Sequence, residues 1–192
     1  MQLGPRENER QNSIPKMIEG KDGGLLYREV QYFRQLWVWI LLLSISLTTI
    51  WGMVQQLFLG KPFGNNPAPD TVLIVIVIIF GFGFPYAFYK MNLTTEIRSD
   101  GIYYRFFPFH RSFHKIAAED IISYEIRNYS PIKEYGGWGI RHGRKGKAYN
   151  VSGNRGVQLG LSNGKQLMIG TQRPEELAEA LSLLLKGKRL QL

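Results

Sequence analysis

The sequence contains no cysteine, and this absence excludes disulfide bonds and thiolate metal sites. Charge is missing from two long apolar stretches, 36–59 and 71–89, neither of which contains Asp, Glu, Lys or Arg. A helix needs about 20 apolar residues to cross a hydrocarbon core about 30 Å thick. At about 1.5 Å per residue, helices over the two stretches are about 36 Å and about 28 Å long. We therefore predict two transmembrane helices, at 36–59 and 71–90, joined by an extracytoplasmic loop at 60–70.

The charges that flank the stretches predict the orientation of this helical hairpin. Short flanks rich in Lys and Arg stay on the cytoplasmic side of a membrane. Such residues lie before the first stretch and after the second, whereas the loop contains only Lys61: they are Lys16, Lys21, Arg28 and Arg34, then Lys90, Arg98 and Arg105. We therefore expect a multi-pass protein of the cell membrane with its N- and C-termini in the cytoplasm.

Small residues recur at helical spacing inside both apolar stretches. Ser44, Thr48 and Gly52 share one face of the first predicted helix, and Gly83 and Ala87 share one face of the second. Small residues let membrane helices approach closely, so we predict that these five pack the two helices against each other. A seam between two copies of the chain is the alternative, which would make the protein a homo-oligomer. No ionisable residue lies inside either stretch, and this argues against an ion pathway or a proton relay.

The rest of the chain divides into a tail and one domain. Residues 1–30 are polar and lack hydrophobic periodicity, so we predict a disordered tail. Residues 91–187 are numerous enough for one small domain with its own core. Residues 91–192 contain sixteen Lys and Arg against nine Asp and Glu, so most of the net charge of +9 belongs to this part.

The predicted domain has the pattern of a β-rich fold closed by a helix. Apolar and polar residues alternate over 122–127 and 157–161, as in half-buried strands. Asp-Gly at 100–101 and Asn-Gly at 163–164 are typical of tight turns between strands. Pro174 suits the first position of a helix, and this helix has an apolar face formed by Leu177, Leu181, Leu184 and Leu185. We expect about seven strands and one C-terminal α-helix.

Strands followed by one helix resemble the pleckstrin-homology (PH) fold. The segments 137–141, 149–153, 156–159 and 169–177 also resemble a family of prokaryotic membrane proteins of unknown function, in which two helices precede a bacterial PH-like domain. This resemblance extends from Gln31 to Leu185. It implies a fold class, a membrane α-helical hairpin of two transmembrane helices with a β-rich PH-like domain. It implies no activity and no ligand.

A basic segment within the domain is the strongest candidate for a contact site. The segment 141–147 contains four Lys or Arg between glycines, and a tryptophan precedes it: the candidate residues are Trp138, Arg141, Arg144, Lys145 and Lys147. Basic residues near an anionic inner leaflet contribute about 1 kcal/mol each. A solvated hairpin tip is the alternative. PH domains that hold inositol phosphates use basic residues around their first hairpin, whereas here that turn, 99–101, is short and acidic, so headgroup recognition of that kind is not expected.

No cluster of residues reaches the level of a catalytic or metal site. His110 and His114 have a spacing that binds metals on a helix, but their segment reads as a turn and lacks a nearby carboxylate. The neighbouring acids at 119–120 and 175–176 are adjacent in sequence rather than a facing pair. We therefore predict no catalytic residue, no cofactor and no metal ligand. The basic charge is not accompanied by a nucleic-acid-binding pattern, so no nucleic-acid partner is expected.

We expect from these observations a non-enzymatic, membrane-anchored interaction module. The hairpin would lie in the lipid bilayer, and the PH-like domain would engage a protein partner or anionic lipid headgroups at the cytoplasmic face. The alternative hypothesis is a membrane-bound enzyme that acts on a lipid-derived substrate, with its site between the helices and the domain.

Overall fold

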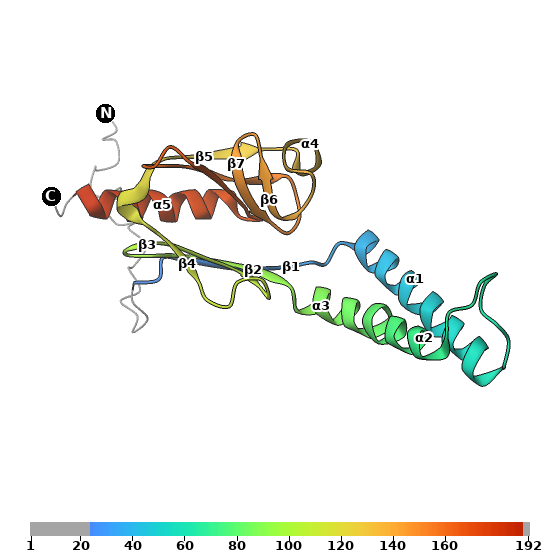
Figure 1. Cartoon of the computed structure of the whole chain (residues 1–192). Helices are drawn as coiled ribbons and strands as arrows, with labels where there is room; N and C mark the ends of the chain where they lie inside the picture. The colour runs from blue at the N-terminus through green and yellow to red at the C-terminus, as the bar shows by residue number, and fades with distance from the viewer. Residues whose placement is uncertain (1–23, 190–192) are drawn as a thin grey trace, which may run out of the picture.

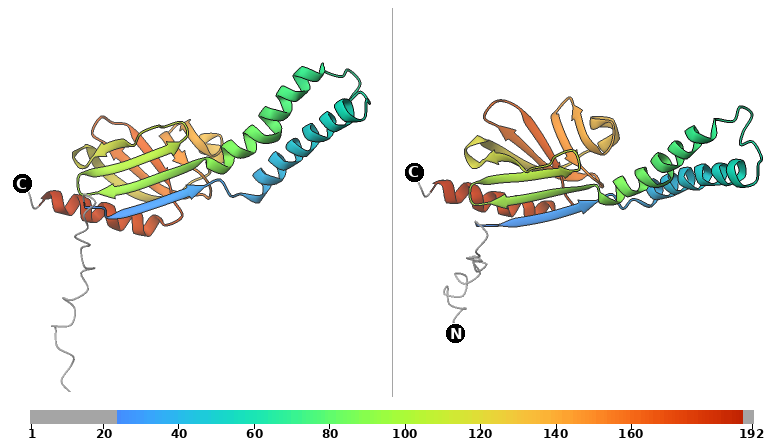
Figure 2. Two further views of the ribbon diagram at one scale, coloured as in Figure 1. Left: turned by 90° about the horizontal axis from the view of Figure 1, so that it is seen from below. Right: turned by 60° about the horizontal axis from the view of Figure 1, so that its bottom comes forward.

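The hairpin of helices is inserted between two neighbouring strands of one sheet. The computed structural model describes residues 24–189. Strand β1 (Tyr27–Tyr32) precedes the helices, and β2 (Asn92–Arg98) follows them. The two strands pair antiparallel, with Tyr32 opposite Asn92 and Tyr27 opposite Ile97. Since Tyr32 and Asn92 are partners, the first helix begins and the second helix ends at the same end of the sheet. The hairpin projects from that end (Figures 1 and 2).

Strand β1 corrects the prediction of a disordered tail at 1–30. The strand buries Tyr27, Glu29 and Gln31 and exposes the residues between them. Two of the three buried side chains are polar, so a search for alternating apolar residues does not detect the strand. The turn at 99–101 consequently joins the second and third strands of the sheet rather than forming its first hairpin. The rest of the predicted tail, residues 1–23, lies outside the described residues.

Two β-sheets form the domain (Figure 1). The first has the order β1-β2-β3-β4, with β3 at Gly101–Phe107 and β4 at His114–Ala117. The second has the order β5-β8-β9-β7-β6, and its strands are β5 (Ile121–Asn128), β6 (Gly139–Gly143), β7 (Gly146–Asn150), β8 (Arg155–Leu161) and β9 (Gln166–Gly170). All its pairs are antiparallel except β7 and β9, which run parallel. The described chain thus contains nine strands instead of the expected seven or so.

The core lies between the sheets and is closed by the C-terminal helix α5 (Pro174–Arg189). Leu177, Leu181 and Leu184 are buried, so the apolar face predicted for this helix is confirmed at these positions. Helix α5 packs on strands of both sheets, β1 and β2 in one and β5 and β8 in the other. Two short helices connect strands: η4 (Ala118–Asp120) precedes β5, and α4 (Pro131–Tyr135) follows it. The sequence analysis did not predict α4, which is less than two turns long.

Each arm of the hairpin is a continuous apolar helix. The first consists of α1 (Leu36–Met53) and the π-helical segment η2 (Val54–Phe58). The second consists of α2 (Asp70–Ile76), the π-helical segment η3 (Val77–Gly83) and α3 (Phe84–Lys90). The arms Leu36–Phe58 and Asp70–Lys90 are long and apolar enough to cross a membrane.

The helices pack through a different row of residues from the one predicted. Ser44 and Thr48 are exposed and donate hydrogen bonds to carbonyl groups of their own helix. Ser46 is buried instead, and its hydroxyl donates to the Phe80 carbonyl of the other arm at 3.2 Å. Gly81 is buried, and the side chains of Thr49 and Ile50 of the first arm lie over it.

The remaining predicted packing residues lie at the margins of this contact. Gly52 lies against the ring of Phe63 in the connecting loop, Gly83 is exposed and Ala87 is half-buried. The prediction is therefore wrong for Ser44, Thr48 and Gly83 as contacts within the hairpin. The contact row follows the large side chains Val38 and Leu42, and this places Ser44 and Thr48 on the other face of the helix.

Candidate functional site

The five predicted contact residues line two separate depressions of the domain. Arg144, Lys145 and Lys147 border a polar groove on the second sheet, whereas Trp138 and Arg141 border an apolar cleft next to the helices. The β6–β7 hairpin lies between them, because it contributes residues to both. The structure therefore divides a segment that the sequence analysis treated as one surface.

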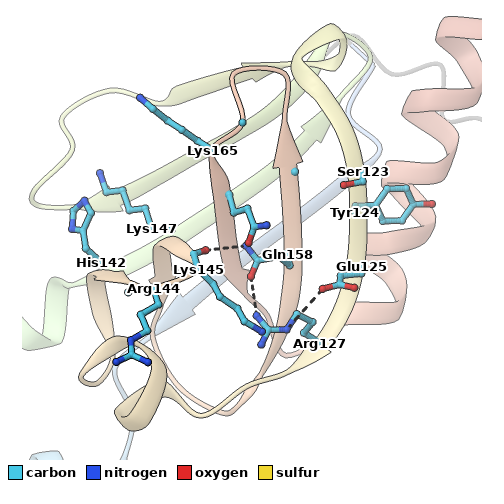
Figure 3. A pocket seen from close by; sticks show the side chains of 15 residues that line it. Ser123, Tyr124, Glu125, Arg127, His142, Arg144, Lys145, Lys147, Gln158 and Lys165 are labelled. Atoms are coloured by element: carbon cyan, nitrogen blue, oxygen red, sulfur yellow. Dashed lines mark hydrogen bonds and ion pairs between the residues drawn. The ribbon is translucent and has the colours of Figure 1, made fainter.

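The depression on the second sheet, which we call the basic groove, has a volume of about 1050 Å³ and is lined by residues from all five strands of that sheet and two turns. Figure 3 shows Glu125 and Arg127 from β5, Gln158 from β8, and Lys145 from the β6–β7 turn around it. The turn between β8 and β9 adds Lys165.

Gln158 connects the parts of the basic groove. Its side chain is buried, and its Oε1 accepts a hydrogen bond of 3.0 Å from the Arg127 guanidinium. Its Nε2 donates to the carbonyl oxygen of Lys145 at 3.5 Å. The turn that carries Arg144 and Lys145 is thus linked to strand β8, and the basic side chains are held on a framework of paired strands.

The groove has an excess of positive charge. Arg127 is balanced by Glu134 at 2.8 Å and by Glu125 at 3.9 Å. The other four cations of the lining form no ion pair within residues 24–189: Arg144, Lys145, Lys147 and Lys165. Unpaired cations at the border of a concave surface attract anionic partners.

The pKa values around Arg127 are consistent with a fixed ion pair. The hydrogen bond from the Ser130 amide, followed by that from Arg127, lowers the pKa of Glu134. Burial lowers the pKa of Arg127, but the bond to Glu134 opposes this effect, and the net result is a raised pKa. Both groups therefore remain charged at neutral pH, and Arg127 keeps its place beside Gln158.

One end of the basic groove lies far from the helical hairpin. Strand β2 leaves the hairpin at Asn92 and reaches the opposite end of its sheet near Asp100. The Asp100 carbonyl accepts a hydrogen bond from the Ala118 amide, and the Asp120 carbonyl accepts one from the Ser162 amide. The β8–β9 turn with Lys165 therefore lies at the end opposite to the hairpin (Figure 1).

The apolar cleft has a volume of about 660 Å³ and lies between the base of the hairpin and the domain. Its lining includes Trp37 and Leu41 from α1, Phe88 from α3, and Trp138 and Ile140 from the domain. Gln35 and Arg141 supply the only amide and the only charge among the described lining side chains. The alternative hypothesis of an enzyme would place its site here, but these two groups offer hydrogen bonds rather than a nucleophile or a general base.

The histidines singled out by spacing form part of an aromatic cluster. The rings of His110 and His114 are 4.1 Å apart, and Tyr104 and Tyr149 lie against them. Burial, then the charges of His114 and Lys147, lowers the pKa of His110. Within residues 24–189 no group of three or more His, Cys, Asp or Glu side chains is placed to hold a metal ion.

Three members of the basic groove were missed by the sequence analysis. Arg127, Gln158 and Lys165 lie 11 or more positions in the sequence from the nearest of the predicted residues Arg144, Lys145 and Lys147. The two turns meet because β7 pairs with β9, a parallel contact that no local pattern reveals.

Comparison with known proteins gives one match. The sequence profile of a family of unknown function (DUF6141) matches residues 18–185. No curated protein and no solved structure matches the chain.

Proposed function

The chain belongs to DUF6141, a family of unknown function, and from its geometry we propose a membrane-anchored, non-enzymatic interaction module whose basic groove binds an acidic segment of a partner protein. In this proposal the helical hairpin crosses the cell membrane, both termini are cytoplasmic, and the domain is PH-like. The unpaired cations that line the groove, most of them in turns between paired strands, are the observation that carries the proposal.

Exposed apolar surface on the hairpin supports its place in a bilayer. Large apolar side chains point outward along both arms, among them Leu43, Leu47, Ile78 and Phe82. Soluble proteins rarely expose a continuous apolar surface of this extent. At the base of the hairpin, Arg34 lies over Tyr32 and Lys90 lies over Tyr86 and Tyr89. Aromatic and basic side chains of this kind are typical of the membrane–water interface.

The arrangement of the domain supports the PH-like assignment and also shows where the chain differs from that fold. A four-stranded meander, a second sheet and a closing helix are its PH-like features. The parallel β7–β9 pair and the helices inserted between β1 and β2 are its own. Because the chain enters and leaves the hairpin through paired strands, the domain is tied to the hairpin at two points.

The position of the basic groove favours a protein partner over the membrane surface. The groove opens on the outer face of the second sheet and extends to the end opposite the hairpin. A lysine there, such as Lys165, is directed to the cytoplasm when the hairpin is inserted. An acidic segment of a partner protein meets these cations without competition from the lipid.

The orientation is tested by cysteine labelling, which the absence of native cysteine makes direct. In intact cells a membrane-impermeant maleimide should leave Lys145→Cys unlabelled and should label Asn65→Cys in the connecting loop. After the cells are permeabilised, both variants should react. Labelling of Lys145→Cys from outside intact cells would overturn the orientation.

Binding is tested with the full chain in nanodiscs of phosphatidylcholine, using a fluorescent octaglutamate peptide as the probe. We expect binding that weakens with salt. The double variant Lys145→Gln/Lys165→Gln should weaken it about tenfold, because two close charge pairs contribute about 0.5–1 kcal/mol each. The matched control Lys133→Gln/Lys186→Gln removes the same charge from exposed positions outside the groove and should change binding less than twofold.

Two outcomes contradict the proposed partner. Equal weakening by both double variants would mean that net charge, not the groove, attracts the peptide. Failure to bind octaglutamate, combined with tighter association of the domain with phosphatidylglycerol nanodiscs that depends on Lys145, would identify an anionic membrane surface as the ligand instead.

A further inference from the structure

The apolar cleft at the base of the hairpin is placed where a bilayer lipid would meet the domain. We propose that it is a lipid-binding site: one acyl chain of a glycerophospholipid enters the cleft, and the phosphate of the same lipid contacts Arg141. This inference rests on the proposed insertion of the hairpin but is independent of the basic groove.

The walls of the cleft are continuous with the surface of the hairpin that would face lipid. Trp37 and Leu41 line the cleft, and both remain more than half exposed, at 56% and 54%. They belong to the first two turns of α1, so they lie at the edge of the hydrocarbon layer when the helix is inserted. A lipid beside α1 therefore reaches the cleft without leaving the bilayer, which makes an acyl chain a better occupant than a soluble ligand.

The size and chemistry of the cleft fit a single chain. Its volume of about 660 Å³ lies within the range of about 300–1,000 Å³ that is usual for ligand sites. Phe88 and Ile140 add apolar side chains from α3 and β6. Phe109 and Ile132 lie at its border on the domain side and are strongly exposed, at 66% and 65%. Such exposed side chains gain by contact with an acyl chain, since apolar surface is then removed from water.

The turn before β6 brings an aromatic ring and a charge to the same edge of the cleft. Gly137 and Gly139 have φ values of 125° and 112°, which residues with a Cβ atom rarely adopt. Trp138 lies between these two glycines. The Trp138 ring is 6.2 Å from that of Trp37 across the cleft, and its indole N–H donates to the Gly153 carbonyl. Arg141 Nε donates to the Trp138 carbonyl at 2.9 Å, which fixes the guanidinium at this edge.

Polar groups at the cleft match the head of a glycerophospholipid. Arg141 is exposed, and a guanidinium is well suited to a phosphate because its N–H groups match the oxygens. Gln35 Oε1 is buried without a hydrogen-bond partner within residues 24–189, while its Nε2 donates to the Val151 carbonyl. This oxygen can accept a hydrogen bond from a hydroxyl of the head region. An apolar chain and a polar head therefore both find counterparts.

Photocrosslinking in nanodiscs tests the site with the full-length chain. The probe is phosphatidylglycerol with a diazirine near the carbonyl end of one acyl chain, and the cross-linked residues are located by mass spectrometry. We expect cross-links to Phe109, Trp138 or Ile140 in the domain, in addition to outward-facing residues of the hairpin such as Leu43.

Matched variants separate a chain within the cleft from a lipid that is merely close. Leu41→Trp fills the cleft from α1 and should reduce the domain cross-links about tenfold. Leu43→Trp makes the same change at an exposed position of α1 outside the cleft and should leave them unchanged. Arg141→Gln should reduce them about fivefold. Unchanged melting temperatures would show that the three variants are folded.

The outcomes distinguish this inference from the proposed function. Cross-links to the hairpin but none to the domain would overturn the lipid site and leave the membrane anchor intact. Equal domain labelling in Leu41→Trp and Leu43→Trp would also overturn it. Unchanged labelling in Arg141→Gln would remove the phosphate contact. If the hairpin itself were not labelled, the proposed membrane anchor would be wrong.

Discussion

Replacing Gly146 with alanine is expected to destabilise the domain by about 2–6 kcal/mol and to abolish binding at the basic groove. Gly146 begins β7 with a φ of 92°, a conformation that a residue with a Cβ rarely adopts. A Cβ atom there would lie 2.0 Å from the Gln166 carbonyl oxygen of β9. Two costs therefore add: backbone strain of about 1–3 kcal/mol and overpacking of about 1–3 kcal/mol.

The clash has a functional consequence because Gly146 lies at the junction of the two turns that line the groove. Relief of the clash requires β7 to move away from β9, and the parallel contact from Lys147 to Leu167 would be lost. Arg144 and Lys145 would then separate from Lys165. Thermal unfolding in detergent should show a melting temperature lower by about 10 °C, and octaglutamate binding should disappear.

Gly164→Ala is the matched control. Gly164 has a φ of 74°, but no atom lies within 4 Å of the position of its Cβ. This variant carries the backbone strain without the clash, so a loss of about 1 kcal/mol is expected. If Gly146→Ala were no more destabilising than Gly164→Ala, the close approach of β7 and β9 would be incorrect.

Replacing Glu29 with alanine is expected to cost about 3 kcal/mol, because it leaves several buried donors without an acceptor. Glu29 is 7% exposed and lies on β1, before the helical hairpin. Its carboxylate accepts hydrogen bonds from Tyr27 at 2.8 Å, from Thr171 at 2.6 Å and from the Gln172 amide at 3.0 Å. These bonds tie β1 to the connection between β9 and α5, some 140 residues away in the sequence.

The same substitution should loosen one of the two attachments of the hairpin. Hydrogen exchange at the amides of Tyr27–Tyr32 should accelerate more than at those of β2, since β1 is the edge strand of its sheet. Glu125→Ala is the control, because that side chain is 67% exposed and its ion pair with Arg127 spans 3.9 Å. A loss of stability below about 0.5 kcal/mol is expected there. Equal effects of the two substitutions would show that the Glu29 network does not hold β1.

The hydrogen-bond network of Glu29 also affects a neighbouring tyrosine. Burial raises the pKa of Tyr27, the hydrogen bond with Thr171 lowers it, and the bond to Glu29 raises it again; the net shift is upward. Tyr27 is therefore a neutral donor throughout the physiological range, as its bond to a carboxylate requires.

Part of the fold could be predicted from local pattern alone. Two uncharged stretches indicated two long apolar helices, because their composition depends on no contact elsewhere in the chain. The leucine row of 177–184 indicated the closing helix, since its apolar face repeats with the period of an α-helix. The Asn-Gly turn at 163–164 lies between β8 and β9, as its sequence predicts.

The candidate sites could not be predicted in the same way. Strand β1 buries Glu29 and Gln31, and its polar sequence gives no apolar alternation. The face of α1 that is buried is the one that carries the large side chains Val38 and Leu42. The spacing of Ser44 and Thr48 therefore does not identify the buried face. The basic segment 141–147 is one run of charge in sequence, yet Arg141 and Lys145 line different depressions.

The amino-acid sequence by itself determined the elements whose physical cause is local: the apolar helices, the strong turns, the amphipathic last helix and the excess of positive charge. Only the tertiary structure decided that the hairpin is an insertion between β1 and β2, that β7 runs beside β9, and that the basic residues divide between a groove and a cleft. Pairing between distant strands is the reason. The backbone groups that form these hydrogen bonds are common to nearly all residue types, so the local sequence does not indicate which strands pair.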